Sequence, residues 1–136
     1  MNKIATTRPI EPDFPLLFLA AYLARRIYAQ TSEAIEHRLE EIATERVDRG
    51  IASFESKPDW RLQLGDATTL NIGSLDKCPM KRMYGDYDSG LAKHFGGLAW
   101  IPLYAVYLAV RHAFCPTFFV NSRRLNRIWR NRLAAA

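Results

Sequence analysis

One stretch of the chain, residues 95–110 (FGGLAWIPLYAVYLAV), contains sixteen residues without a charge. It lies between Lys93-His94 and Arg111 and shows no polar face, which a helix of a soluble domain normally has. A helix that is apolar on all sides needs a large core or a membrane, and a chain of 136 residues offers only a small core. A helix of this length reaches the lower end of the range for bilayer-spanning helices. The sequence therefore predicts one transmembrane helix within residues 91–112.

Three residues within this stretch predict how the helix packs. Gly96 and Gly97 carry no side chain, so that the backbone of another helix can come close at the entry. Pro102 removes a backbone hydrogen bond and is expected to bend the helix, which membrane spans tolerate. Continuing the span past Arg111 would place an arginine in hydrocarbon, at a cost of about 2.5–3.5 kcal/mol. We therefore expect the span to end at Val110.

Charge is distributed unevenly along the chain. Residues 1–60 contain eight Lys/Arg and ten Asp/Glu, whereas residues 91–136 contain seven Lys/Arg and no acidic residue. Orientation is predicted from the Lys and Arg residues near the span alone, because these favour the cytoplasmic or matrix side. Six follow the span and four precede it, which predicts that the C-terminus lies on that side.

The N-terminal part begins with a second apolar run, which opens a predicted helix over residues 14–29. Glu11 and Asp13 adjoin the run, where a signal peptide would carry positive charge, so we expect the segment to be retained, with Asp13 as its N-cap. Its eleven apolar residues are too few to span a bilayer. Two interpretations remain open. The helix lies on the membrane surface with Arg25 and Arg26 at the head groups, or it docks on a partner protein.

A second N-terminal helix is predicted over residues 33–49, separated from the first at Thr31 or Ser32 and ended by Gly50. Glu45 and Arg49 are spaced to form a supportive i,i+4 pair. The helix has an apolar stripe at helical spacing, and little of the remaining chain is expected to cover it. We therefore expect the stripe to face a partner through Ile35, Leu39, Ile42 and Val47.

Residues 55–90 are rich in Pro, Gly, Asp and Ser and predict a long irregular connector. Such a connector is uncommon inside a compact domain and fits a segment laid over other proteins better. Within it, residues 60–72 alternate apolar and polar side chains around Gly65-Asp66, which is a weak signal for a β-hairpin.

No pattern of residues predicts catalysis or metal binding. The segment Asp86-Tyr-Asp-Ser-Gly90 resembles the start of a calcium loop, but its glycine comes one position early and no glutamate follows at the twelfth position. Cys78 and Cys115 have no metal-ligand spacing. His94 and His112 flank the predicted span at opposite ends. The chain contains no phosphate-binding loop and no dinucleotide fingerprint. We therefore expect a chain that is not an enzyme by itself and holds no cofactor.

The tail, residues 121–136, predicts a basic amphipathic helix capped by Asn121 or Ser122. Three targets are weighed for its arginines: anionic lipid such as cardiolipin, an acidic protein surface, or nucleic-acid phosphates. Its position shortly after the predicted span favours lipid or protein and makes nucleic acid the least favoured. The residues expected to contact lipid or a partner are Arg111, Arg123, Arg124, Arg127, Trp129, Arg130 and Arg132.

The sequence thus predicts a mainly α chain in four parts: an amphipathic helical region (1–54), a connector (55–90), a transmembrane helix (91–112) and a basic interfacial helix (113–136). The layout of residues 90–136 resembles the small single-span accessory subunits of mitochondrial respiratory complexes and ATP synthase, with Gly96-Gly97 at the entry and arginines at the exit.

This resemblance implies a structural, non-catalytic accessory subunit of a large energy-transducing complex, with the other subunits as its partners. It implies the mitochondrial inner membrane with the C-terminus in the matrix; the bacterial inner membrane, with the C-terminus in the cytoplasm, is the alternative. Two other functions are weighed. One is an independent membrane-anchored adaptor or regulator that recruits a soluble partner, and the other is a soluble helical protein that binds nucleic acid through the arginine tail.

Overall fold

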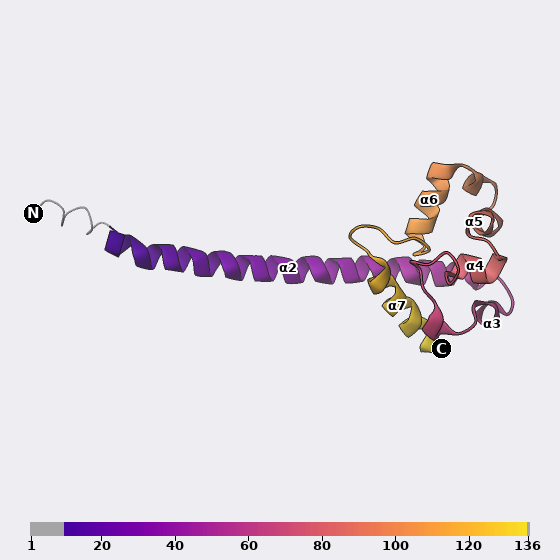
Figure 1. Ribbon diagram of the computed structural model, residues 1–136, viewed down its shortest axis with the longest axis horizontal. Coiled ribbons are helices and arrows are strands. Elements are labelled where there is room, and N and C mark those ends of the chain that lie inside the picture. Colours follow the sequence, from indigo (N-terminus) through magenta and orange to yellow (C-terminus); the bar gives the residue numbers. More distant parts are fainter. Residues whose placement is uncertain (1–9, 136) are drawn as a thin grey trace, which may run out of the picture. The chain divides into compact units, whose positions relative to one another are not determined.

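The computed structural model describes the backbone of residues 10–135 and the side-chain surroundings of residues 15–97 and 99–135. The secondary structure of residues 10–135 is helical, without a strand, which confirms the mainly α class. The chain divides into two compact units, Met1–Arg38 and Leu39–Ala136. Helix α2 (Ile10–Phe54) belongs to both (Figure 1).

Helix α2 contains no break at residues 31–32, where two separate helices were expected. The hydroxyl of Thr31 donates a 2.8 Å hydrogen bond to the carbonyl of Ile27, one turn earlier. A threonine that bonds back in this way is accommodated inside a helix instead of ending it. Asp13, the expected N-cap, lies within α2 because the helix begins at Ile10.

The core of the second unit begins on one face of α2. Ala43, Val47, Gly50 and Phe54 recur at intervals of four, three and four residues, and all are buried. The ring of Phe54 lies 5.4 Å from the ring of Phe114, measured between centroids. These four residues form the stripe by which an amphipathic helix packs on a core.

Gly50 was expected to end the helix, but α2 continues past it to Phe54. A Cβ atom at this position would collide with the carbonyl oxygen of His112 and would lie 3.0 Å from the ring of Trp129. The glycine is therefore explained by the close approach of the 112–114 segment to the α2 backbone.

The segment between Phe54 and Gly90 is ordered into short helices and contributes to the core. It contains α3 (Trp60–Leu64), η1 (Ala67–Thr69), α4 (Pro79–Tyr84) and the beginning of α5 (Tyr87–Phe95). The hairpin suggested for residues 60–72 is absent, since Trp60–Leu64 is helical. The segment supplies five buried apolar residues that the expectation of an irregular connector did not foresee: Leu64, Leu70, Ile72, Cys78 and Met80.

The predicted transmembrane stretch does not form one helix. Helix α5 ends at Phe95, η2 (Gly97–Trp100) follows, and α6 (Pro102–Arg111) is a separate helix. Gly96 has a φ of +88°, a conformation that ends a helix, and Pro102 stands in the first turn of α6, where its missing N–H costs nothing. Across residues 10–135, no helix has both the length and the apolarity that a membrane crossing requires. The predicted single span is therefore not supported.

Helix α7 (Ser122–Ala134) is the basic tail helix that the sequence predicted, and it crosses the C-terminal part of α2 (Figure 1). Asn121 is its N-cap, because the Asn121 side chain accepts a 3.0 Å hydrogen bond from the backbone N–H of Arg124. Its apolar side is buried in the core through Leu125, Ile128 and Trp129.

Candidate functional site

The predicted partner-facing stripe lies mostly within the chain's own fold. Val47 is 0% exposed, and Leu39 and Ile42 pack on the core of the second unit. Ile35, in the first unit, is 54% exposed. Residues 55–90 were expected to form a connector without a core, and for this reason little of the chain was expected to cover the stripe.

Most arginines of the tail contact acidic side chains of α2. Arg124 and Arg127 both donate to the carboxylate of Glu40, with shortest N–O distances of 2.7 and 2.6 Å. The hydrogen bond from Arg127 is the largest cause that holds the pKa of Glu40 below its usual value. Arg132 pairs with Asp48 at 2.9 Å. These three arginines therefore attach α7 to α2.

The other predicted contact residues of the tail differ in their surroundings. Arg130 donates two hydrogen bonds, of 2.8 and 3.1 Å, to the carbonyl of Leu70. Trp129 is 0% exposed and donates a hydrogen bond to the carbonyl of Ala113. Arg123 is exposed. In this fold, Arg123 and not Trp129 offers its side chain to solvent.

The three residues expected to pack helices instead shape the chain reversal between α5 and α6. Gly96 and Gly97 are exposed, and a Cβ atom at either position would meet open space. Pro102 begins α6. Within the described part of the second unit, Gly96 and Gly97 therefore make no close helix–helix contact.

His94 joins two hydroxyl groups in a small polar network beside the core. Its Nδ1 lies 2.6 Å from the hydroxyl of Tyr84, and its Nε2 lies 2.7 Å from the hydroxyl of Ser53. Ser53 donates its own proton to the carbonyl of Gly50 at 2.6 Å. This network assigns the Nε2–H of His94 as donor to Ser53, and burial lowers the pKa of His94 to about 4. The contact between His94 and Ser53 links α5 to α2.

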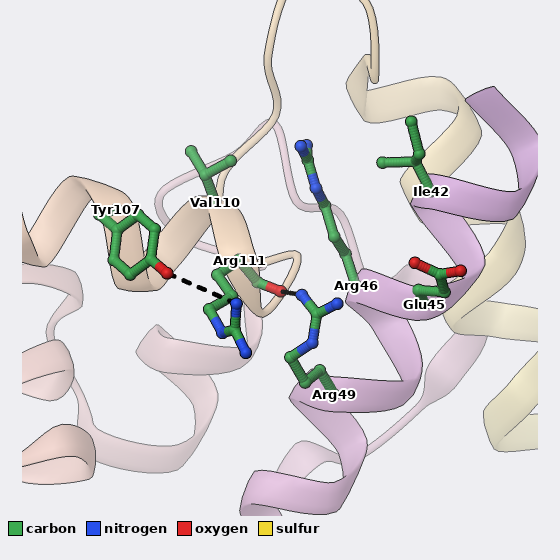
Figure 2. Close-up of a pocket in the computed structure, with 7 residues that line it drawn as sticks. All are labelled: Ile42, Glu45, Arg46, Arg49, Tyr107, Val110 and Arg111. Atoms are coloured by element: carbon green, nitrogen blue, oxygen red, sulfur yellow. Dashed lines mark hydrogen bonds between the residues drawn. The ribbon is translucent and has the colours of Figure 1, made fainter. Parts of the chain in front are cut away.

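A pocket with a cavity of about 380 Å³ lies between α2 and α6. Its lining brings together three arginines from the two helices, one carboxylate and an apolar wall (Figure 2). The lining residues are Ile42, Glu45, Arg46, Arg49, Tyr107, Val110 and Arg111.

The three arginines of this basic pocket have different contacts. Arg49 donates a 2.7 Å hydrogen bond to the carbonyl of Arg111, the last residue of α6. Arg111 reaches the hydroxyl of Tyr107 at 3.4 Å. Arg46 has no hydrogen bond or ion pair to any residue in the described part of the chain. Burial, together with the nearby charge of Arg49, lowers its pKa. The expected i,i+4 ion pair between Glu45 and Arg49 is not formed.

The sequence named one member of this pocket, Arg111, as a contact residue and missed the others. Arg46 and Arg49 are three positions apart on α2, which places them on one side of that helix. Arg111 is separated from Arg49 by 62 positions and is brought beside it only by the fold. In the sequence, the available signal for this pocket was the pair Arg46 and Arg49 on a helix rich in glutamate.

The first unit presents a series of exposed apolar side chains along α2, four of them consecutive. Leu16, Leu17, Phe18 and Leu19 are 64%, 67%, 70% and 51% exposed. Four further exposed residues follow on the same helix: Tyr22, Leu23, Ile27 and Tyr28. The two arginines predicted at lipid head groups, Arg25 and Arg26, lie among them and are exposed.

The described residues contain no group of three or more His, Cys, Asp or Glu side chains that could hold a metal ion. Asp86, the first residue of the calcium-like segment, instead caps α5, where its carboxylate accepts a 3.0 Å hydrogen bond from the N–H of Ser89. Comparison with protein-family models, curated proteins and solved structures found no match for this chain.

Proposed function

We propose that the chain is a non-catalytic accessory protein of a membrane assembly and attaches to the lipid surface through the first-unit part of α2. The observation that carries this proposal is the run of four consecutive, largely exposed apolar side chains at residues 16–19. Burying a single leucine or phenylalanine is worth about 1.5–3 kcal/mol, so the run supplies enough free energy for attachment.

The arrangement of these side chains favours lipid over a protein groove. Successive helical residues are about 100° apart, so residues 16–19 point to almost every side of α2. A protein groove covers one face of an amphipathic helix, whereas acyl chains and head groups adapt to several faces. Arg25 and Arg26 follow closely and suit anionic head groups. The full apolar run of eleven residues, 14–24, covers about 16 Å at 1.5 Å per residue, which is too short to span a bilayer, so we place it at the interface.

The second unit adds a folded body to this attachment. It has its own core and is basic in its last third, with no acidic residue after Asp88. The assembly we propose is an energy-transducing complex of the mitochondrial inner membrane or of the bacterial inner membrane. Of the layout that suggested such a complex, the arginines after residue 110 support the proposal and the single span does not. Nucleic-acid binding is less favoured, because Arg124, Arg127 and Arg132 are engaged by carboxylates of α2.

Vesicle sedimentation of the full chain tests the attachment. Phosphatidylcholine vesicles containing phosphatidylglycerol should carry the wild-type chain into the pellet. The double variant Leu17→Ser/Phe18→Ser should bind about tenfold more weakly or worse, because two exposed apolar groups that enter the interface are lost.

The matched control is Leu62→Ser/Leu75→Ser, which removes two leucines of the second unit that are 80% and 70% exposed. This control should bind as the wild type does. A wild-type chain that stays in the supernatant would overturn the proposal and point to a protein partner for residues 16–19. Equal binding by the two double variants would also overturn it.

A further inference from the structure

We infer that the basic pocket between α2 and α6 binds a phosphate monoester whose ester group is small and apolar or aromatic. This inference concerns the second unit and goes beyond the attachment of the first unit to lipid.

The charge of the pocket calls for an anion. Three guanidinium groups line the cavity together with one carboxylate, that of Glu45. Figure 2 shows the side chains of Arg49 and Arg111 close to one another, whereas the side chain of Arg46 extends from α2 in another direction and Glu45 lies beside Ile42. Like charges gathered at one partly buried site repel one another, and an anion between them relieves the repulsion. A phosphate monoester carries about −1.5 to −2 charges at neutral pH, and guanidinium groups bind its oxygens in bidentate fashion.

Arg46 is the residue that the fold does not explain. Arg49 donates a hydrogen bond to the Arg111 carbonyl, one of the carbonyls at the C-terminus of α6 that lack a partner within the helix. Cations near a helix C-terminus commonly make this interaction. Arg46 is only partly exposed, yet it makes no hydrogen bond or ion pair within the described chain. Burial and the charge of Arg49 lower its pKa, as expected for a cation that lacks a counter-charge. A bound phosphate supplies that counter-charge.

The apolar part of the lining indicates that the ligand is more than inorganic phosphate. Ile42 and Val110 are partly buried pocket residues, and Tyr107 adds an aromatic ring that is 52% exposed. The cavity of about 380 Å³ falls within the range of small-molecule sites, about 300–1,000 Å³. A phosphate alone would leave this apolar wall in contact with water, whereas the ester group of a monoester covers it.

Two sources supply this chemistry: a soluble phosphorylated metabolite and the head group of a phosphatidic-acid type of lipid. Isothermal titration calorimetry of the full chain distinguishes them with three probes: inorganic phosphate, phenyl phosphate, and dihexanoyl phosphatidic acid below its micelle concentration. Phenyl phosphate should bind about tenfold more tightly than inorganic phosphate, because its ring covers the apolar wall. Tighter binding of the short-chain lipid than of phenyl phosphate assigns the lipid source, and the reverse order assigns a soluble ester.

Arg46→Gln is the decisive variant because no internal contact depends on this side chain. Its affinity for phenyl phosphate should fall about tenfold or more with the loss of a charge-assisted contact. The melting temperature of the ligand-free variant should stay unchanged or rise, since a repulsive charge is gone. Arg123→Gln removes an exposed arginine outside the pocket and should leave affinity unchanged. Glu45→Gln should increase affinity several-fold, because it removes the only carboxylate of the lining.

Binding of phenyl phosphate by Arg46→Gln with the wild-type affinity would overturn the inference, as would no binding of either ester by the wild-type chain. These probes are soluble and need no membrane, so the two proposals are tested independently. A chain that does not bind vesicles can still bind the phosphate esters, and a chain that does not bind the esters can still bind vesicles.

Discussion

The indole Nε1–H of Trp129 donates a 3.0 Å hydrogen bond to the backbone carbonyl of Ala113, and the Trp129 side chain is fully buried. Ala113 is itself buried, with a φ of +60°, at the turn that follows α6. The hydrogen bond therefore connects α7 to this turn. A positive φ is uncommon for a residue other than glycine, so the surrounding contacts hold Ala113 in this conformation. Arg124, Arg127 and Arg132 of the same helix pair with carboxylates of α2, so the basic tail is part of the folded second unit.

Replacing this tryptophan tests the anchor. Trp129→Phe should lower the free energy of unfolding by about 2–3 kcal/mol, because it removes buried atoms and leaves the Ala113 carbonyl without its partner. Urea unfolding measures the change. Trp100→Phe is the matched control, since Trp100 is 71% exposed, and it should change stability little. Equal effects of the two substitutions would refute the buried position of Trp129.

Gly50→Ala should destabilise the fold although alanine favours helices. In an unobstructed helix the substitution would add up to about 1 kcal/mol. Here the new Cβ would collide with the His112 carbonyl and press on Trp129, so we expect a loss of about 1–3 kcal/mol. Thermal unfolding of this variant should be compared with that of Gly97→Ala, where a Cβ meets open space. A higher melting temperature for Gly50→Ala would contradict the packing described.

Glu40 should contribute measurably to the attachment of α7. Glu40→Gln weakens its contacts with Arg124 and Arg127, and we expect a loss of about 1 kcal/mol at neutral pH because the site is partly exposed. The difference from wild type should shrink in 1 M NaCl, where the screening length is about 3 Å. Because the folded-state pKa of Glu40 lies below the usual value of 4.5, this stability should be fully present above pH 4.5 and be lost as the pH falls further. Glu55→Gln, at an exposed position, is the control.

Acid should destabilise the second unit through His94. Its pKa falls from 6.5 to about 4 on folding, so the unfolded chain takes up a proton in this range and the folded chain does not. The free energy of unfolding should therefore be highest above pH 6.5 and decline between pH 6.5 and 4. One pKa unit corresponds to about 1.4 kcal/mol, and partial solvent access reduces the total to about 2 kcal/mol.

The variant His94→Gln isolates this contribution. Its stability should depend less on pH over the same range, while the part due to His112, whose pKa burial also lowers, should remain. Urea midpoints measured at intervals between pH 7 and 4 give both curves. Parallel curves for wild type and His94→Gln would exclude His94 as the group responsible.

Local patterns of the sequence were sufficient for the helical class and for the tail helix with its Asn121 cap. They were not sufficient for the secondary structure of residues 95–110. The absence of charge suggested one helix there, whereas Gly96 and Pro102 divide the stretch into separate helices. At Thr31 the opposite happened. Threonine often begins a helix, so a boundary was predicted there, but Thr31 lies inside α2.

The candidate sites show the same limit. Leu17 and Phe18 were recognisable as an apolar segment with arginines behind it, since that feature is local. The pocket was not recognisable, because Arg46 and Arg49 meet Arg111 only after α6 has packed beside α2. Such a juxtaposition depends on long-range packing, which spacing within a single helix does not encode.

A polarity-sensitive fluorophore on Leu17→Cys reports whether residues 16–19 enter the lipid surface. Burial raises the pKa of the Cys78 and Cys115 thiols, which favours labelling of the exposed engineered position. The matched probe is placed on Leu62→Cys, which is highly exposed in the second unit. On addition of vesicles containing phosphatidylglycerol, the emission at position 17 should shift to the blue while that at position 62 stays unchanged. No shift at position 17, or the same shift at both positions, would contradict the account.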